Sequence, residues 1–337
     1  MNITTLKELL IEGIKKTVPT VIDRIGTYDN VIDDRSKKLI VPMYHRIVES
    51  FSDDPFRLGM CVQKKTFEKQ AKYFSESYKS IQLSDIKENK SFIKDDANYV
   101  SYTFDDGYKD NILTAKPILD KYKLNATFFI CCNIFTKDKQ FWWDLIINSF
   151  AQTKCEYLDL SPINHNFPET KIYLNSSNRK IKLLFLLQYL WTLDDVVFIK
   201  EVAEYIELSL LGKKHTIDKL NEDDIKKLHQ SGYEIAAHTL SHPNLQLVSF
   251  EEQKREFVES KNILEEIIGD EIRGFAYPAG FKDLSLENLA KESGYKYAVS
   301  AVKGVNRKFN YFSIERIGMP ESNVPDLKRC IYNYCKQ

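Results

Sequence analysis

Short runs rich in β-branched and aromatic residues alternate with amphipathic segments along most of the chain. Seven of these runs predict β-strands. Helical segments separate most of them, at about residues 66–78, 221–232 and 285–294. A further helix is predicted to begin after Ser249, because Ser249 and Glu252 have the spacing of a capping box. The predicted strands are Leu39–Tyr44, Tyr99–Phe104, Ala126–Cys132, Tyr233–Ala237, Ile272–Tyr277, Tyr295–Val302 and Ile314–Ile317.

The alternation of strands and helices favours a parallel sheet in an α/β fold. Polar residues stand directly after two of the strands, in residues 105–107 and in residues 238–242. In a (β/α) barrel the site lies at the carboxyl ends of the strands, so this placement favours a barrel with its site on that face.

About a hundred residues separate the third and fourth predicted strands, far more than a crossover needs. Within them, residues 138–220 are predicted to form a helical insertion beside or over the active-site face, because the run 181–191 is too apolar to stand free in water. Trp142 and Trp143, near its start, have two interpretations. They stack on a sugar ring of the substrate, or they are core anchors of the insertion.

Apolar residues recur at helical spacing through residues 1–26, and most basic residues lie off that stripe. The sequence therefore predicts an N-terminal amphipathic helix over about residues 1–30, followed by a main domain over residues 31–337. Two placements of the helix stay open. It packs on the main domain, or it lies on a membrane surface as a peripheral contact near a lipid-linked substrate.

The 337 residues include 48 Lys plus Arg and 48 Asp plus Glu, so no net charge favours nucleic acid as a partner. No run approaches the ~20 apolar residues of a membrane span. Charged residues at positions 7 and 8 interrupt what would be the apolar core of a signal peptide. The six cysteines show no paired zinc-type spacing. These features favour a reduced, cytoplasmic protein, free or at the inner face of the membrane.

Two adjacent carboxylates, Asp105 and Asp106, end the second predicted strand. Two carboxylates held close together cannot both stay ionised without a cation nearby. In one interpretation one of them binds a metal and the other acts as a base. In the other they form an ordinary Asp-Asp-Gly turn through Gly107.

His238 and His242 stand four residues apart after another predicted strand, so a helical turn or a tight loop puts both imidazoles on one side. Two imidazoles and one carboxylate, with positions left for water, are a ligand set for zinc or a similar divalent ion. Thr239 stands where a metalloprotease helix carries Glu, which excludes that signature. Taken alone, the pair also fits two ordinary histidines in a loop.

Together the two segments resemble two motifs of the polysaccharide deacetylase family, carbohydrate esterase family four. The first motif, Thr-Phe-Asp-Asp-Gly, matches residues 103–107, and the second, His-Ser/Thr-x-x-His, matches residues 238–242. Agreement extends to residues 125–130 and 275–280, and the resemblance covers about residues 39–319 apart from the insertion. It implies an irregular, incomplete (β/α) barrel that removes N-acetyl or other N-acyl groups from amino sugars. The substrate would be a surface polysaccharide or its lipid- or nucleotide-linked precursor.

The resemblance also implies a role for each residue of the first two motifs. Asp106, His238 and His242 would hold a divalent metal, with Zn²⁺ as the first candidate. The metal would activate water and polarise the amide carbonyl, and Asp105 would accept the proton of the water.

The third motif of the family matches less completely. Tyr277, Pro278 and Ala279 follow its pattern, and the resemblance makes them substrate contacts, with the backbone N–H of Ala279 as an oxyanion donor. The arginine that orients the base in this motif is replaced by Ala276.

Two arginines could substitute for it: Arg273, three residues earlier, and Arg316, on the last predicted strand, which is preferred. The C-terminal histidine that serves most members as general acid is also missing, because no histidine follows His242. Of the others only His45 follows a strand, so only it is placed for the catalytic face. Its position resembles the branch that deacetylates poly-N-acetylglucosamine, in which an early Tyr-His supplies the acid. A histidine near a carboxylate is expected to be protonated at neutral pH.

Two other classes stay open: an inactive carbohydrate-binding homologue, and a metal-dependent amidase acting on a non-sugar amide. Binding of an N-acetyl sugar without release of acetate would indicate the first. Turnover of amides that contain no hexosamine would indicate the second. The intact first and second motifs favour the sugar deacetylase.

Overall fold

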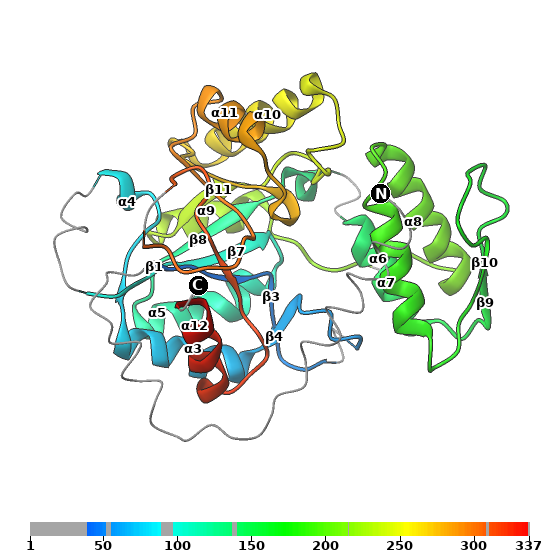
Figure 1. The fold of residues 1–337 in the computed structure, drawn as a ribbon, viewed down its shortest axis with the longest axis horizontal. Helices are drawn as coiled ribbons and strands as arrows, with labels where there is room; N and C mark the ends of the chain where they lie inside the picture. The colour runs from blue at the N-terminus through cyan, green and yellow to red at the C-terminus, as the bar shows by residue number, and fades with distance from the viewer. Residues whose placement is uncertain are drawn as a thin grey trace. The chain divides into compact units, whose positions relative to one another are not determined.

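The computed structural model describes residues 39–51, 55–88, 97–136, 140–214, 216–307 and 310–335 (Figure 1). The chain divides into two compact units, Met1–Asp34 and Arg35–Gln337, and every described residue belongs to the second. The amphipathic helix predicted over residues 1–30 lies outside the described residues.

A seven-stranded sheet forms the centre of the described unit, with helices around it (Figure 1). Every pairing between its strands is parallel. The strands in spatial order are β13 (Tyr297–Val299), β12 (Gly274–Ala276), β11 (Glu234–Ala237), β8 (Ala126–Ile130), β7 (Tyr102–Asp106), β2 (Pro42–Tyr44) and β14 (Ile317–Gly318). Each of the seven predicted runs contributes one strand, so the predicted parallel α/β sheet is confirmed.

The two edges of this sheet approach each other through one irregular segment. Ile317 in β14 pairs with Pro42 in β2. Three residues earlier, Ile314 forms a parallel bridge with Val299 in β13, and its carbonyl accepts from Ser300 N at 2.9 Å. The segment 314–318 therefore bonds to both edges, which gives the incomplete barrel that was predicted.

Two predicted strands are interrupted. Residues 39–44 divide into β1 (Leu39–Ile40) and β2, and residues 99–104 divide into β6 (Tyr99–Val100) and β7. The register is the same on both sides of the gap, because Leu39 pairs with Tyr99 and Met43 with Thr103. Pro42 has no N–H to donate, which accounts for a break in the ladder at this point. β1 and β6 join β5 (Lys79–Ser80) in a three-stranded sheet, and β3 (Arg46–Val48) pairs with β4 (Cys61–Gln63).

Polar side chains cap the first turns of three helices that surround the sheet, α9 (Glu222–Gln230), α10 (Phe250–Ile268) and α11 (Leu284–Glu292). Asn221 and Asp224 form a reciprocal capping box, with both side-chain-to-backbone bonds at 2.9 Å. Ser249 accepts from Glu252 N at 3.2 Å, so the helix predicted to follow it is confirmed. The other helices outside the insertion are α3 (Lys64–Ser77), α4 (Asp85–Glu88), α5 (Lys116–Tyr122) and α12 (Val324–Cys335).

An insertion of helices and one hairpin stands between β8 and β11. The predicted helical character holds for α6 (Trp142–Gln152), α7 (Arg179–Leu190) and α8 (Val196–Leu211). The antiparallel hairpin of β9 (Tyr157–Asp159) and β10 (Lys171–Tyr173) was not predicted. α6 packs against both α7 and α8, and the packing buries Leu183, Leu186 and Leu190 of α7. Ile181, Leu184 and Phe185 of α7 are exposed, so the apolar run 181–191 is buried only in part.

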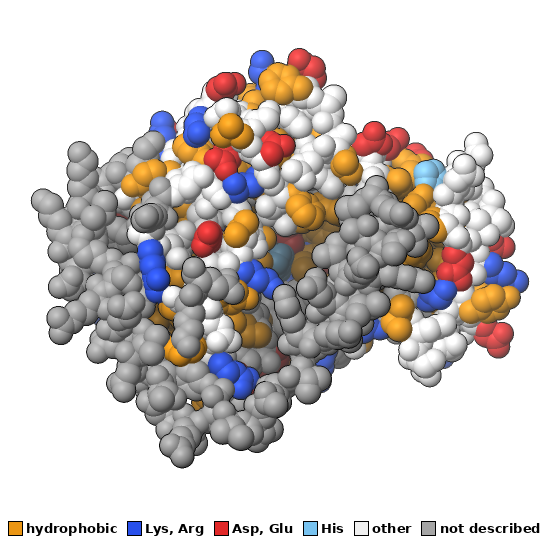
Figure 2. Space-filling model, viewed as in Figure 1, with side chains coloured by type: hydrophobic (Ala, Val, Ile, Leu, Met, Phe, Trp, Pro, Cys, Tyr) orange, Lys and Arg blue, Asp and Glu red, His pale blue; other side chains and the backbone are white. Residues whose placement is uncertain are grey.

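Surface charge is mixed in sign, as the equal numbers of acidic and basic residues predict. On the coloured part of the face in Figure 2, acidic and basic side chains are interspersed. All six cysteines lie in the described part of the chain, and none forms a disulfide. No helix within the described ranges is both long and apolar enough to span a bilayer.

Candidate active site

Two adjacent carboxylates at the carboxyl end of β7 face different side chains. Asp106 has φ of 77° and Gly107 has φ of 95°, so the chain turns sharply directly after Asp105. A side chain at Gly107 would be strained by this φ, and its Cβ would lie only 2.9 Å from Ile134 Cδ1. The turn leaves Asp105 against an arginine and Asp106 against two histidines.

Asp106, His238 and His242 form a buried cluster suited to a cation. The Oδ1 atom of Asp106 lies 3.6 Å from His238 Nε2 and 3.7 Å from His242 Nε2. One candidate ligand atom from each residue lies within 4.8 Å of the others. Asp106 Oδ1 is buried and has no hydrogen-bond partner among the described residues. Burial and the neighbouring Asp105 raise the pKa of the Asp106 carboxyl, because both disfavour its charged form. A divalent ion would supply the positive charge that stabilises the carboxylate.

The state of the two imidazoles also fits a metal. His238 Nδ1 lies 2.8 Å from the carbonyl oxygen of Ala276, which can only accept a hydrogen bond. Nδ1 must therefore carry the proton, and Nε2 keeps its lone pair toward Asp106. Burial lowers the pKa of both His238 and His242, so both are neutral, as metal ligands must be.

The loop that carries the histidines is strained and held from behind. Thr239 has φ of 66° and His242 has φ of 59°. The carboxylate of Glu256, fully buried on α10, accepts from Leu240 N at 2.7 Å and from Ser241 N at 2.9 Å, and it also accepts from the Ser241 hydroxyl. Sequence reasoning did not find Glu256, because its only signal is an acidic residue on the inward face of a helix.

Replacing Glu256 with Ala is expected to raise the metal dissociation constant about tenfold or more, because the loop would lose three hydrogen bonds behind its two ligands. Glu256→Gln keeps one acceptor oxygen, so its metal dissociation constant should lie between those of the wild type and Glu256→Ala. Competition with a chelator measures the constant, and Glu259→Ala, at an exposed position of the same helix, is the control. An unchanged constant in folded Glu256→Ala would contradict this positioning role.

Asp105 is bound by Arg316 through both of its oxygens. Arg316 donates to Asp105 Oδ1 at 2.7 Å and to Oδ2 at 2.9 Å, and its Nε donates to Ser300 O at 2.9 Å. Burial raises the pKa of Asp105, but the charge and hydrogen bonds of Arg316, together with His238 and His45, outweigh burial, and the pKa of Asp105 falls to about 2. Arg273 instead pairs with Glu271 at the surface. Of the two arginines considered, the structure brings Arg316 to the base position.

His45 directly follows β2 and lies in the electrostatic field of Asp105. Burial lowers the pKa of His45 to about 4, and the opposing attraction of Asp105 is smaller. Arg316 and His238 lower the pKa further. His45 is therefore neutral at pH 7, whereas the sequence argument, which counted only the carboxylate, made it protonated.

The predicted substrate contacts Tyr277, Pro278 and Ala279 directly follow β12. The Tyr277 ring is buried in the core and its hydroxyl donates to Phe312 O at 3.2 Å, so this side chain faces away from the site. Pro278 is buried, whereas Ala279 is exposed in a tight turn with φ of 51°. The oxyanion role of the Ala279 N–H stays a prediction.

Trp142 and Trp143 are both buried. The Trp143 ring lies 4.6 Å from the His242 ring and 4.4 Å from that of Phe141, between centroids. Trp142 stacks on Trp191. The two rings thus form an apolar wall that helps keep His242 dry, and contact with substrate stays a prediction.

A buried network joins the insertion to the end of β7, and sequence reasoning missed it. The Tyr108 hydroxyl donates to Asp144 Oδ1 at 3.0 Å and accepts from Trp143 Nε1 at 3.2 Å. Lys219, whose side chain is fully buried, pairs with Asp144 and lies 3.6 Å from the centroid of the Tyr108 ring. The Lys219 cation and the Asp144 carboxylate balance each other beside the cluster of Asp106, His238 and His242.

An incomplete (β/α) barrel that gathers ionisable side chains at the carboxyl ends of its strands is the architecture of a barrel enzyme. The polysaccharide deacetylase profile matches residues 92–151 and 200–298. The chain belongs to the polysaccharide deacetylase family. The matched residues include Asp105, Asp106, His238 and His242, and the gap between them falls in the insertion. YxkH of Bacillus subtilis (strain 168), whose name assigns it provisionally to the polysaccharide deacetylases, is 22% identical over 289 residues, 84% of this chain and 72% of that protein.

Solved structures share the fold at low identity. The deacetylase PplD of Streptococcus pyogenes, solved with acetate, has a TM-score of 0.57 at 17% identity and covers 87% of this chain and 98% of its own. IcaB from Ammonifex degensii has a TM-score of 0.56 at 15% identity, covering 90% of this chain and 99% of its own. These likenesses support the fold.

Proposed function

We propose that this protein is a metal-dependent hydrolase that removes the N-acetyl or another N-acyl group from an amino sugar. The substrate would be a surface polysaccharide or its lipid- or nucleotide-linked precursor. The observation that carries the proposal is the unpartnered Asp106 oxygen facing two imidazole Nε2 atoms, beside a carboxylate held by Arg316.

Asp106, His238 and His242 would hold the ion, with Zn²⁺ favoured by the mixed nitrogen and oxygen donors. When bound, a divalent ion supplies Lewis acidity that lowers the pKa of water and polarises an amide carbonyl. The protein contributes a dry, preformed set of donors, because all three side chains are buried.

Asp105 is the base in this proposal. Its pKa of about 2 keeps it ionised, so it can accept a proton from the attacking water throughout the neutral range. Arg316 holds both carboxylate oxygens and is itself fixed by Ser300, which fixes the direction in which the remaining lone pairs point.

His45 is the proposed acid for the departing amine. Because it is neutral at pH 7, it cannot donate until it has received a proton. Asp105 takes a proton from water in the first half of the reaction, and the two side chains lie within each other's field. Passing this proton from Asp105 to His45 would charge the imidazole only when the leaving group needs it.

Replacing His45 with Ala is therefore expected to lower turnover by about a hundredfold, while metal content and substrate affinity stay near those of the wild type. Steady-state kinetics measure turnover and substrate affinity, and metal analysis of the same preparation measures metal content. Near-normal turnover on an N-acetyl sugar would show that the proton comes from another group or from solvent.

The function itself is tested by acetate release from a panel of soluble and lipid-linked N-acetylhexosamines, with and without added Zn²⁺. Metal-dependent release of acetate together with a free sugar amine supports the proposal. Binding of the same sugars without release would indicate an inactive carbohydrate-binding homologue. Hydrolysis of amides that contain no hexosamine, at equal or higher efficiency, would indicate an amidase of another class.

A further inference from the structure

His45 is the single residue at a bend between two strands of different sheets. β2, which ends at Tyr44, belongs to the central sheet, whereas β3, which begins at Arg46, pairs with β4. His45 itself lies in neither ladder and is only half-buried. The position of its backbone therefore depends on contacts from outside the two sheets.

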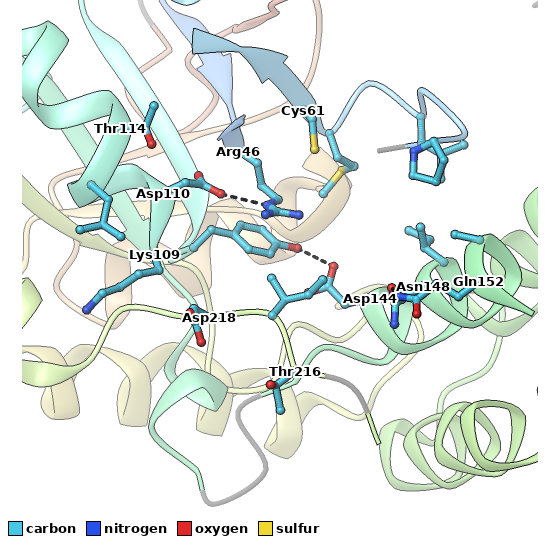
Figure 3. Close-up of a pocket in the computed structure, with 18 residues that line it drawn as sticks. Arg46, Cys61, Lys109, Asp110, Thr114, Asp144, Asn148, Gln152, Thr216 and Asp218 are labelled. Carbon is cyan, nitrogen blue, oxygen red and sulfur yellow. Dashed lines mark hydrogen bonds and ion pairs between the residues drawn. The ribbon is translucent and has the colours of Figure 1, made fainter. Parts of the chain in front are cut away.

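Those contacts come from two adjacent polar side chains, Asp110 and Asn111. Asn111 Nδ2 donates to the carbonyl oxygen of His45 at 2.8 Å. Asp110 accepts from Ile47 N through Oδ1 and from Arg46 Nε through Oδ2, both at 3.0 Å. Figure 3 shows Asp110 and Arg46 pointing toward each other with this second bond between them. Each of the three residues from the bend onward is thus held by one side-chain hydrogen bond.

Packing alone does not explain a polar residue at position 111. Asn111 is fully buried, and its Nδ2 must face His45, because a carbonyl oxygen can only accept a hydrogen bond. Asn111 Oδ1 is buried without a hydrogen-bond partner among the described residues, which costs free energy. A leucine would fill the same space without that cost, so the use of Asn111 lies in the bond that it donates to the bend.

The same short segment carries the other proposed catalytic groups. Asp110 follows Asp106 by four residues, and Asn111 opens a π-helix, Asn111–Ala115. Single π-helical turns are rare and are frequent at functional sites. Residues 105–111 therefore contain the proposed base, one proposed metal ligand and both side chains that hold the bend. A shift of the bend would change the distance between the base and the imidazole.

We propose that Asp110 and Asn111 are positioning residues for His45, the proposed general acid. They fix the backbone at the bend and directly after it, so that the imidazole keeps the distance from Asp105 that proton transfer needs. The proposal rests on the proposed function, because it assumes the role of His45 in that reaction. It adds two residues that act through another side chain.

The first test is kinetic, with tetrameric N-acetylglucosamine as substrate. Asn111→Leu removes the donor at nearly constant volume and should lower kcat about tenfold with KM near that of the wild type, because a displaced acid slows the chemical step without weakening binding. Asp110→Asn keeps the shape and one acceptor oxygen, so its kcat should fall less, about threefold. If Asn111→Leu does not fold, Asp110→Asn decides in its place.

The matched control is Thr153→Val in the insertion. Thr153 is also buried, and its hydroxyl donates to the carbonyl oxygen of Leu210 at 3.0 Å. Thr153→Val removes this donor at constant shape, so it should lower the melting temperature as Asn111→Leu does while kcat stays that of the wild type. An unchanged kcat in folded Asn111→Leu would overturn the positioning role.

A double-mutant cycle separates positioning of His45 from a general structural effect. In the His45→Ala protein there is no imidazole to position, so adding Asn111→Leu should change kcat by less than about twofold. An equal tenfold loss in both backgrounds would show that Asn111 acts on something other than His45, and the proposal would be wrong.

Reaction with diethyl pyrocarbonate tests the position of His45 without any turnover. Peptide mass spectrometry should show that His45 is modified about threefold faster in Asn111→Leu than in the wild type, because the bend opens more often. His229, at the surface, should react equally in both proteins and is the internal reference. If the wild type releases no acetate, the proposed function fails, and this rate still decides the inference. Faster modification then supports it, and an unchanged rate refutes it.

Discussion

Replacing Asp105 with Asn is expected to lower turnover about a thousandfold while the protein keeps its fold and its metal. The amide has the same shape as the carboxylate, and its oxygen can still accept from Arg316, which donates to both Asp105 oxygens in the wild type. An amide cannot accept the proton of water in the pH range of the assay. Acetate release measures the loss, and metal analysis shows that Asp106, His238 and His242 are undisturbed.

The control is Asp120→Asn, the same change at an exposed ion pair on α5, where Asp120 bonds to Lys116 and to the Tyr233 hydroxyl. Its turnover should equal that of the wild type. If Asp105→Asn retained a tenth of the wild-type rate, Asp105 would be structural and the proposed mechanism wrong.

The stability of the protein in acid depends on the ion pair between Asp105 and Arg316. The pKa of Asp105 in the folded protein, about 2, lies below its ordinary 3.8. The ionised carboxylate therefore stabilises the fold by about 2 kcal/mol above pH ~4, and this contribution is lost as the pH falls from about 4 to about 2. The difference in free energy of unfolding between wild type and Asp105→Asn should shrink over that window.

The strands and the cluster of polar residues could be predicted because both depend on local pattern. Seven β-rich runs became seven parallel strands, and parallel strands bring their carboxyl ends to one face whatever their exact order. Asp106 and His238 were therefore expected together, although 132 positions separate them in the sequence. The division of the first strand near Pro42 was not predicted, although proline cannot donate to a ladder.

Other features depend on contacts that no local pattern specifies. Arg316 reaches Asp105 only because the irregular segment 314–318 lies between the two sheet edges, and Arg273 points to Glu271 instead. The neutral state of His45 depends on burial together with the charges of Arg316 and His238, which lie far from it in the sequence. The role of Glu256 could not be predicted, because it needs the position of α10 behind the histidine loop.

Truncating Asp106, His238 or His242 to Ala is expected to remove the metal, of which the wild type should carry about one divalent ion per chain. Three donors are the minimum for tight binding in such a site, so two cannot hold the ion through dialysis. Elemental analysis after loading with Zn²⁺ gives the occupancy. His229→Ala, which removes a surface imidazole beside Asp270, should keep full occupancy.

The effect of Asp106→Ala on stability should change sign with the metal. Without metal, the wild type buries a carboxylate oxygen that has no hydrogen-bond partner among the described residues, so removing the group should leave the melting temperature equal or higher. With Zn²⁺ present, the ion binds the folded wild type and raises its melting temperature, whereas the variant gains nothing. The two melting curves, recorded with chelator and with Zn²⁺, should therefore exchange their order. Full occupancy in all three alanine variants, or a Zn²⁺-dependent rise that survives in Asp106→Ala, would show that the ion is held elsewhere.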